Sequence, residues 1–336
     1  MDGPYKDRTL LGDSGRTSCP SMTNEHARTR AGLLLGLGAY TLWGVLPLYF
    51  KAIVGVLPSE IVAHRILWSI VLLAALATLW HRWGAIRTAV ARPKVLATLA
   101  LTATLIAVNW LVYIWAVLNG HLLAGSLGYY LNPLVNVLLG VFLLKERLTR
   151  AQTFAVGLAA AGVAVLALGA AEGLWISLTL ASSFALYGFL RKVAPVDSLE
   201  GLSIETTILA PIALGYVLWL QQRGASGFGN STTTDLLLIL GGAVTAIPLL
   251  LFTAAAKRLP YSTLGFLQYI APSLQFLLAV LVFGETFTTS HAICFGAIWA
   301  ALVIFAWEGV RTGRAAARSR TAEAEAVICA EACGPS

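Results

Sequence analysis

The sequence predicts an all-α integral membrane protein whose ten transmembrane helices form two inverted five-helix repeats. Three observations predict this fold. The chain is 58% hydrophobic and only 12% charged, whereas a soluble domain carries about 25% charged residues. Apolar segments of spanning length recur along the chain. Two long blocks of sequence also match each other at a constant offset.

Ten apolar segments have about the 20 residues that a spanning helix needs. They lie at 31–50, 58–80, 95–118, 122–144, 151–170, 173–190, 202–220, 236–256, 259–283 and 291–310. Most connectors between them are short, so neighbouring helices are expected to run antiparallel and to pack as one bundle. The first segment is too long for a signal-peptide core and has no small-residue cleavage site, which favours a retained span.

The basic residues predict the orientation in the membrane. If the N-terminus is cytoplasmic, 20 of the 23 Lys and Arg residues lie in cytoplasmic tails and loops. Only Lys51 and Arg223 fall on the outer side, and Arg65 lies inside a span. Lys and Arg are enriched in cytoplasmic loops. The pattern therefore predicts a multi-pass protein of the inner or plasma membrane with both termini in the cytoplasm.

The two halves of the chain repeat at an offset of 139 residues. The matched pairs are Tyr130 and Tyr269, Pro133 and Pro272, Glu146 and Glu285, Thr149 and Thr288, and Gly157 and Gly296. Since each unit holds five spans, an odd number, the second copy enters the membrane upside down. Inverted repeats are typical of secondary transporters, in which one half rocks against the other around a central site. A duplicated structural bundle without transport is the alternative.

This repeat divides the chain into four parts. The expected parts are a disordered cytoplasmic tail at 1–30, one repeat at 31–170, an inverted repeat at 171–310 and a cytoplasmic tail at 311–336.

Several ordered blocks of the sequence are specific enough to compare with known families. They are AYTLWGVLPLYFK (39–51), EIVAHRILWS (60–69), NWLVYIWAV (109–117), SLGYYLNPLVNVLLG (126–140), YGFLRK (187–192) and STLGFLQYIAP (262–272). With these blocks, residues 31–310 resemble the EamA-like branch of the drug/metabolite transporter superfamily, and within it the RarD-type permeases. The resemblance implies a central cavity between the repeats and export of metabolites or amino acids, but it does not name a substrate.

Three charged or titratable residues lie at the start of the second apolar segment. A charge in hydrocarbon costs about 2.5 kcal/mol or more, so it usually faces a partner or a wet cavity. Glu60 and His64 are four residues apart and share a helix face, whereas Arg65 points about 100° away from His64. We predict that all three line the outer part of a substrate pathway. Arg65 would anchor an anionic group through bidentate contact, and His64 would couple protons.

Structural roles for these residues remain as alternatives. Arg65 could snorkel outward or pair with helix-end carbonyls, and His64 could pack within the bundle through a hydrogen bond.

Further polar and aromatic residues complete the predicted site. The additional substrate-contacting residues are Asn109, Trp110, Tyr129, Tyr130, Asn132, Gln268 and Tyr269. The predicted gating or coupling residues are Glu205, Pro133, Pro272 and Trp43. A proline bends its helix and frees a carbonyl one turn earlier, which suits a cavity lining. Aromatic packing, an interfacial position for Trp43, and a salt bridge from Glu205 to Arg191 or Lys192 are the alternatives.

The sequence offers no constellation for enzymatic chemistry. It has no nucleophile with a base, no paired catalytic acids, no nucleotide loop and no C-x-x-C pair among its four cysteines. We therefore expect no cofactor, no bound metal and no nucleic-acid partner. The expected partners are the lipid bilayer, a small-molecule substrate and protons as the coupling ion.

The predicted function is a secondary active transporter that exports a small metabolite, an amino-acid-like compound or a drug by alternating access. A non-transporting membrane scaffold or sensor built on the same fold is the alternative. The oligomeric state is left open, with a homodimer among the options.

Overall fold

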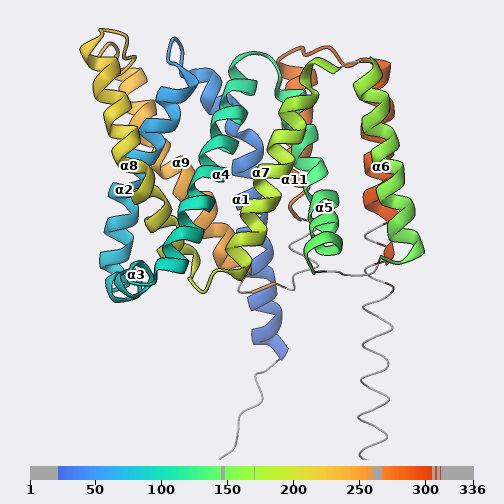
Figure 1. The fold of residues 1–336 in the computed structure, drawn as a ribbon, viewed down its shortest axis with the longest axis horizontal. Coiled ribbons are helices and arrows are strands. Elements are labelled where there is room, and N and C mark those ends of the chain that lie inside the picture. The colour runs from blue at the N-terminus through green and yellow to red at the C-terminus, as the bar shows by residue number, and fades with distance from the viewer. Residues whose placement is uncertain are drawn as a thin grey trace, which may run out of the picture.

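The computed structural model describes residues 22–144, 148–169, 171–256, 258–259, 267–304, 307–308 and 311. Within these ranges every regular element is a helix (Figure 1). The predicted tail at 1–21, most of the predicted tail at 311–336, and part of the ninth predicted span lie outside the described residues.

The helices follow one another with short connectors. They are α1 (Met22–Ala52), α2 (Pro58–Leu79), α3 (Trp83–Val90), α4 (Pro93–Leu118), α5 (Leu122–Leu144), α6 (Arg150–Gly169), α7 (Leu174–Val193), α8 (Ser198–Gln222), α9 (Thr232–Ala256) and α11 (Ile270–Leu277). A 3₁₀ turn, η1 (Ala171–Gly173), precedes α7, and a π-helical turn, η2 (Leu278–Val282), extends α11. A last apolar helix spans Thr289–Ile304.

Ten of the described helical segments are apolar and cross the bundle. Seven of them, α1, α2, α4, α6, α7, α8 and α9, are long and apolar enough to span a membrane by themselves. The others are α5, with 23 residues, and the shorter apolar helices Ile270–Val282 and Thr289–Ile304. The predicted all-α, ten-helix membrane fold is therefore confirmed.

Two local features differ from the sequence prediction. α1 begins at Met22, so part of the predicted disordered tail is helical. Residues 22–30 contain no glycine or proline, and their alanine, glutamate and arginine residues favour helix. The segment expected as a loop after α2 contains α3, which buries Ile86 and Ala89. With eight residues, α3 is too short to be detected as a span.

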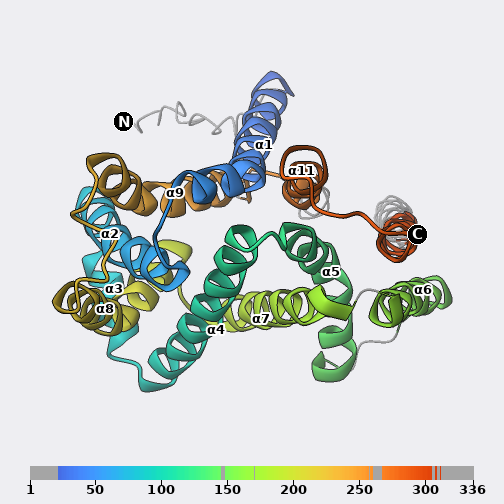
Figure 2. The same cartoon turned by 90° about the horizontal axis from the view of Figure 1, so that it is seen from above.

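The strongest contacts between helices are preserved when the two halves of the bundle are exchanged. The exchange pairs α1 with α7, α2 with α8, α4 with α9, and α5 with α11. It converts the α1–α9 contact into α7–α4, α1–α11 into α7–α5, and α2–α9 into α8–α4, and all of these contacts occur. The α2–α8 and α5–α11 contacts map onto themselves. This is the arrangement of an inverted repeat, and Figure 2 shows α2 and α8 together at one edge, away from α6.

Glycines permit close contact between α2 and α9. A Cβ atom at Gly242 would lie 2.6 Å from the carbonyl carbon of Trp68, and one at Gly241 would lie 2.9 Å from Cγ of Arg65. Small residues at such crossings let helix backbones approach closely inside a membrane. The Gly-Gly pair therefore fixes how α9 meets the part of α2 that carries Arg65.

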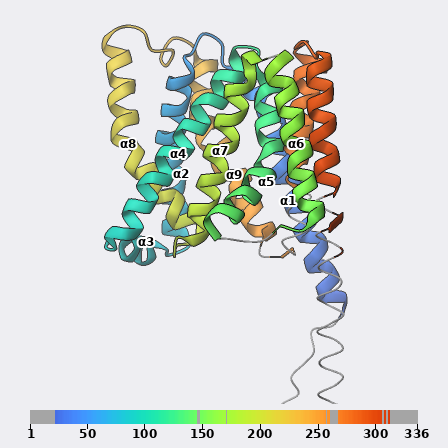
Figure 3. The same ribbon diagram turned by 45° about the vertical axis from the view of Figure 1, so that its right-hand side comes forward.

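One end of the bundle carries most of the basic side chains that the structure describes. We call it the basic face, and its residues are Arg82, Arg87, Arg92, Lys94, Arg150, Arg191 and Arg258. α2 and α9 end at this face, α6 and α8 begin there, and α3 lies there beside the end of α2 (Figures 1 and 3). The opposite face is formed by the connectors 53–57, 119–121, 223–231 and 283–288.

Candidate functional site

Arg65 lies inside the bundle, seven residues beyond the start of α2 and 4% exposed. Its Nε donates a hydrogen bond of 3.0 Å to the hydroxyl of Thr245 on α9. Its guanidinium carbon lies 4.8 Å from the ring centroid of Trp110 and 5.3 Å from that of Phe50. Among the described residues, none accepts a hydrogen bond from its two terminal nitrogens, and no carboxylate pairs with it.

Aromatic side chains surround this guanidinium. Tyr113 lies next to Phe50 and Tyr129, with ring centroids 6.2 and 5.4 Å apart. The Tyr113 hydroxyl is buried without a hydrogen-bond partner. We call Arg65, Phe50, Trp110, Tyr113 and Tyr129 the central cluster. It combines one cation, an unpartnered phenol and aromatic faces drawn from α1, α2, α4 and α5.

Asn109 connects the central cluster to α7 through hydrogen bonds. Its Nδ2 donates to the Leu180 carbonyl at 3.1 Å and to the Ser183 hydroxyl at 2.9 Å, both on α7. Its Oδ1 accepts a hydrogen bond of 3.2 Å from the hydroxyl of Tyr129. The Asn109 amide is therefore engaged within the bundle, where it orients Tyr129. The sequence alone could not identify this role, because one of the partners is a backbone carbonyl.

The repeat-matched tyrosines meet each other. Tyr130 of α5 stacks on Tyr269 just before α11, with ring centroids 6.3 Å apart and an interplanar angle of 16°. The Tyr130 hydroxyl also forms a hydrogen bond with the hydroxyl of Ser273. The structure thus places both tyrosines at the α5–α11 contact, apart from the polar contacts of Arg65.

The other predicted site residues near the α5–α11 contact lie as follows. Asn132 is 7% exposed, and its Oδ1 has no partner. Gln268 is half-buried next to Tyr269, and Pro272 is buried in the first turn of α11. The backbone of Pro133 lies inside α5, which continues to Leu144.

Trp43 joins α1 to α11 through its backbone. Pro47 lies inside α1, and because proline lacks an N–H, the carbonyl four residues earlier loses its helical partner. That carbonyl belongs to Trp43, and it accepts a hydrogen bond of 3.1 Å from Nε2 of Gln275. The Trp43 ring packs against Tyr40 and Phe252, with centroid distances of 5.5 and 5.9 Å. Trp43 therefore has a packing role, not a place beside Arg65.

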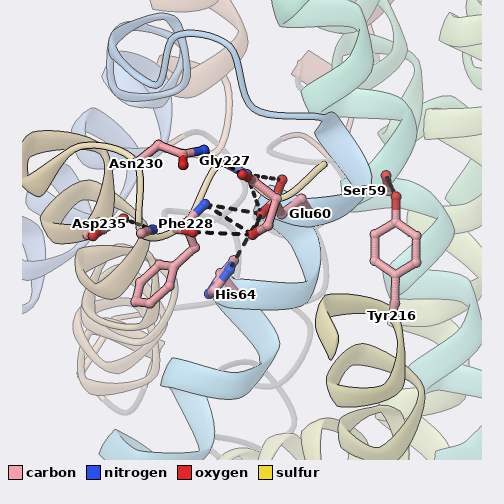
Figure 4. Close-up of polar contacts among 10 residues, drawn as sticks. Ser59, Glu60, His64, Tyr216, Gly227, Phe228, Asn230 and Asp235 are labelled. Atoms are coloured by element: carbon pink, nitrogen blue, oxygen red, sulfur yellow. Dashed lines mark hydrogen bonds and ion pairs between the residues drawn. The ribbon is translucent and has the colours of Figure 1, made fainter. Parts of the chain in front are cut away.

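Glu60 joins the start of α2 to the loop after α8 at the opposite face. Its fully buried carboxylate accepts hydrogen bonds from the Ser226 hydroxyl at 2.7 Å and from the Gly227 amide at 2.9 Å. The Phe228 amide lies at 3.4 Å (Figure 4). We call Glu60 with residues 226–228 the opposite-face latch. In this conformation the loop that follows α8 occupies the carboxylate, and the contact of Glu60 with substrate stays a prediction.

His64 lies one turn from Glu60 and packs against the same loop. Its ring stacks on Phe228 with a centroid distance of 4.8 Å, and Figure 4 shows it between Phe228 and the Glu60 carboxylate. The distance from Nε2 to the nearer Glu60 oxygen is 4.0 Å, and neither ring nitrogen has a hydrogen-bond partner. The sequence left a hydrogen-bonded packing role open for His64, and the structure shows stacking instead.

An equivalent contact closes the basic face. Arg82 follows the end of α2 and donates hydrogen bonds to Glu200 and Asp197, which lie at the start of α8. The hydrogen bond to Glu200, followed by that to Asp197, raises the pKa of the Arg82 guanidinium above its usual value. We call these three residues the basic-face latch. Its Arg82 side chain is 39% exposed, whereas the Glu60 side chain of the other latch is fully buried.

The two latches are related by the inverted repeat. Glu60 is the third residue of α2, and Glu200 is the third residue of α8. Each glutamate binds the segment that follows the end of the other helix. The α2–α8 pair, which maps onto itself under the exchange of halves, is therefore fastened at both ends.

Glu205 lies deeper along α8, in a buried polar cluster. It accepts a hydrogen bond of 2.7 Å from the Thr102 hydroxyl of α4 and one of 3.4 Å from the Tyr187 hydroxyl of α7. Nε of Arg191 lies 3.5 Å from the same carboxylate. Glu205 therefore forms the salt bridge to Arg191 that the sequence offered as an alternative. The side chain of Lys192 is outside the described residues.

Glu285 caps the start of α5. Its two carboxylate oxygens accept hydrogen bonds of 2.7 Å from the backbone amides of Leu122 and Leu123. The first amides of a helix lack intrahelical partners and carry the positive end of its dipole, so a carboxylate there is stabilising. This contact joins the second half of the chain to the first at the opposite face. The repeat counterpart, Glu146, lies outside the described residues.

Comparison with known proteins is consistent with the fold and the repeat. The EamA-like transporter family matches residues 30–168. An uncharacterized transporter of Vibrio cholerae is 48% identical over 89% of this chain and 99% of that protein. A protein named RarD from Streptomyces exfoliatus is 46% identical over 91% of this chain and 98% of its own. The RarD protein of Escherichia coli K12 is 45% identical over 85% and 97%.

A solved crystal structure has a similar fold. It superposes with a TM-score of 0.56 over 81% of this chain and 96% of the other chain, at 22% sequence identity.

Proposed function

Because the chain belongs to the EamA-like transporter family, we propose that it is a secondary active transporter that exports a small amphipathic anion or zwitterion by alternating access. Family membership places the protein in the bilayer as a transporter-like permease. The substrate class, the direction of transport and the coupling ion are the new parts of the proposal.

The observation that supports this substrate class is the environment of Arg65. A charge at the centre of a membrane helix costs about 2.5–3.5 kcal/mol, and cation–π contacts with Trp110 and Phe50 recover about 0.5–2 kcal/mol each. These contacts leave the two terminal nitrogens for a ligand. Two parallel N–H groups suit a carboxylate, and the surrounding rings suit an apolar or aromatic part. An amino-acid-like metabolite meets both requirements.

The two latches support alternating access. Arg65 is 4% exposed, and the α2–α8 pair is held together at both faces, which supports an occluded state for this conformation. Release of one latch at a time would open the central cluster to one side. The Glu200 carboxylate is buried, but Arg82 is 39% exposed and its pair with Asp197 faces solvent, where an ion pair is worth about 0–1 kcal/mol. The hydrogen bonds to the fully buried Glu60 carboxylate contribute about 1.5–3 kcal/mol each. The basic-face latch would therefore open more easily.

The basic face is proposed to be cytoplasmic, because Lys and Arg are enriched in cytoplasmic loops. Both termini would then be cytoplasmic, and substrate would reach Arg65 from the cytoplasm. Protons remain the proposed coupling ion. His64, with two unpartnered ring nitrogens, and Glu205, in its polar cluster, are the groups that would exchange them.

The test is metabolite export by cells that overproduce the protein. Wild type, Arg65→Ala, Arg65→Lys and the distant control Arg150→Gln are compared at equal membrane abundance, with intracellular and extracellular metabolites measured together. We expect one class of carboxylate to accumulate outside with wild type and the control. Arg65→Ala should lose at least tenfold of this accumulation, and Arg65→Lys should keep part of it because lysine retains the charge without the fork.

Two outcomes would contradict the proposal. Equal export by Arg65→Ala and wild type would remove Arg65 from the substrate site. If metabolite levels inside and outside the cells match those of the empty-vector control, the protein does not transport these metabolites, and a scaffold role is favoured.

A further inference from the structure

An apolar cavity of about 270 Å³ lies at the basic face between α2, α3, α4 and α8. Its walls include Leu73, Ala77, Trp83, Ile86, Leu96 and Ile208. An apolar cavity gives water too few hydrogen-bond partners to hold it. Hydrocarbon is therefore the better occupant.

The polar side chains in the cavity wall do not change this conclusion. Ser203 donates its hydroxyl to the Leu199 carbonyl at 2.7 Å, Thr206 to the Leu202 carbonyl at 2.8 Å, and Thr207 to the Ser203 carbonyl at 2.7 Å. Each hydroxyl proton is used within α8 itself. The cavity thus presents an almost entirely apolar surface to a ligand.

Three exposed cations belong to the segments α3 and early α4 that line this cavity. Arg87 is on α3, and Arg92 and Lys94 are at the junction of α3 with α4. No Asp or Glu occurs between residues 80 and 118, and none of the three cations forms an ion pair with a described residue. Arg82 differs from them, because Glu200 and Asp197 already bind it. The rim therefore carries a local excess of positive charge.

α3 connects the apolar wall to the charged rim. Trp83, Ile86 and Val90 line the cavity at helical spacing, and Arg87 is four residues from Trp83 and three from Val90, next to that face. Trp83 is 43% exposed, and its indole N–H donates to the Thr78 hydroxyl at 2.9 Å. A short amphipathic helix with an exposed tryptophan and arginine is typical of the membrane–water interface.

We propose that this crevice is a binding site for an anionic phospholipid of the leaflet at the basic face. One acyl chain fills the cavity, and the headgroup phosphate and its neighbouring groups contact Arg87, Arg92 and Lys94. Basic pockets between membrane helices recognise anionic headgroups in this way. The ligand would rest on the part of α8 that follows Glu200 and so would brace the α2–α8 contact beside the basic-face latch. The proposal does not depend on the transported substrate.

The test is native mass spectrometry of the purified full-length protein with an equimolar mixture of phosphatidylglycerol and phosphatidylcholine. Each basic residue near a headgroup contributes about fivefold to the affinity for an anionic lipid, so the three together give about 100-fold. Wild type and Arg150→Gln, whose exposed charge lies on α6, should retain phosphatidylglycerol selectively. The triple variant Arg87→Gln/Arg92→Gln/Lys94→Gln should lose this preference.

A second variant tests the cavity separately. Ala74 lines it, so Ala74→Phe should reduce retention of phosphatidylglycerol at least tenfold while the three charges remain. Equal retention of both lipids by wild type, or unchanged selectivity in the triple variant, would overturn the proposal. Unchanged retention by Ala74→Phe would also overturn it, because the acyl chain would then not occupy the cavity.

Discussion

Replacing Glu60 by glutamine tests whether its carboxylate holds the loop after α8 in place. In the wild type this carboxylate has two short contacts, to the Ser226 hydroxyl at 2.7 Å and the Gly227 amide at 2.9 Å. A hydrogen bond to a charged group contributes about 1.5–3 kcal/mol, and a neutral one about 0.5–1.5 kcal/mol. Removing the charge should therefore cost about 1 kcal/mol for each contact, or about 2 kcal/mol for the latch. This cost corresponds to an opening equilibrium about 30-fold more favourable.

Hydrogen–deuterium exchange of the loop amides measures this opening directly, because a locally opened segment exchanges in proportion to its open population. The amides of Gly227 and Phe228 should exchange about 30-fold faster in Glu60→Gln. Glu285→Gln is the matched control: it should accelerate exchange at Leu122 and leave the loop after α8 unchanged. Unchanged exchange at Gly227 in Glu60→Gln would refute the latch, and equal acceleration in both variants would indicate general loosening.

Two further substitutions have expected outcomes that the structure sets. Gly241→Ala places a Cβ atom 2.9 Å from Cγ of Arg65, so overpacking should cost about 1–3 kcal/mol of stability and lower the melting temperature. Gly215 has open space around it, so the control Gly215→Ala should leave the melting temperature unchanged. Gln275→Leu should destabilise the protein by about 1 kcal/mol, because it removes the partner of the carbonyl freed by Pro47. That cost should shrink in a Pro47→Ala background, where the helix regains its own donor, and a thermal-unfolding double-mutant cycle with purely additive effects would contradict this account.

The length and number of the helices could be predicted from the sequence because both follow from the thickness of a bilayer. The predicted segments 58–80 and 122–144 therefore agree with α2 and α5 to within one residue. The repeat was also readable, since Tyr130 and Tyr269 are identical residues at a fixed offset. Short α3 could not be found in the same way, because eight residues are too few to cross a bilayer, although its apolar residues recur at helical spacing.

The roles of the buried polar residues are less predictable, because most of their partners lie far away in the sequence and several are backbone groups. Glu60 was expected in a substrate pathway on the cost of its burial, but that cost is met by an amide of Gly227 and a hydroxyl of Ser226. Asn109 is satisfied by a carbonyl of α7. The same argument from cost is stronger for Arg65, for which the described residues provide one hydrogen bond and two ring faces.

The two latches show what an inverted repeat preserves. Glu60 and Glu200 occupy the same position in α2 and α8, yet one binds backbone amides and the other binds Arg82. The position is inherited from the repeat, whereas the partner follows the membrane face, because arginines are concentrated at the basic face. Both carboxylates are buried, but the partner of Glu200 is an arginine that is 39% exposed, so water and salt compete more readily with the basic-face latch than with the opposite-face latch. Under the proposed alternating access, this difference would favour opening at the basic face, and increasing ionic strength should strengthen that preference.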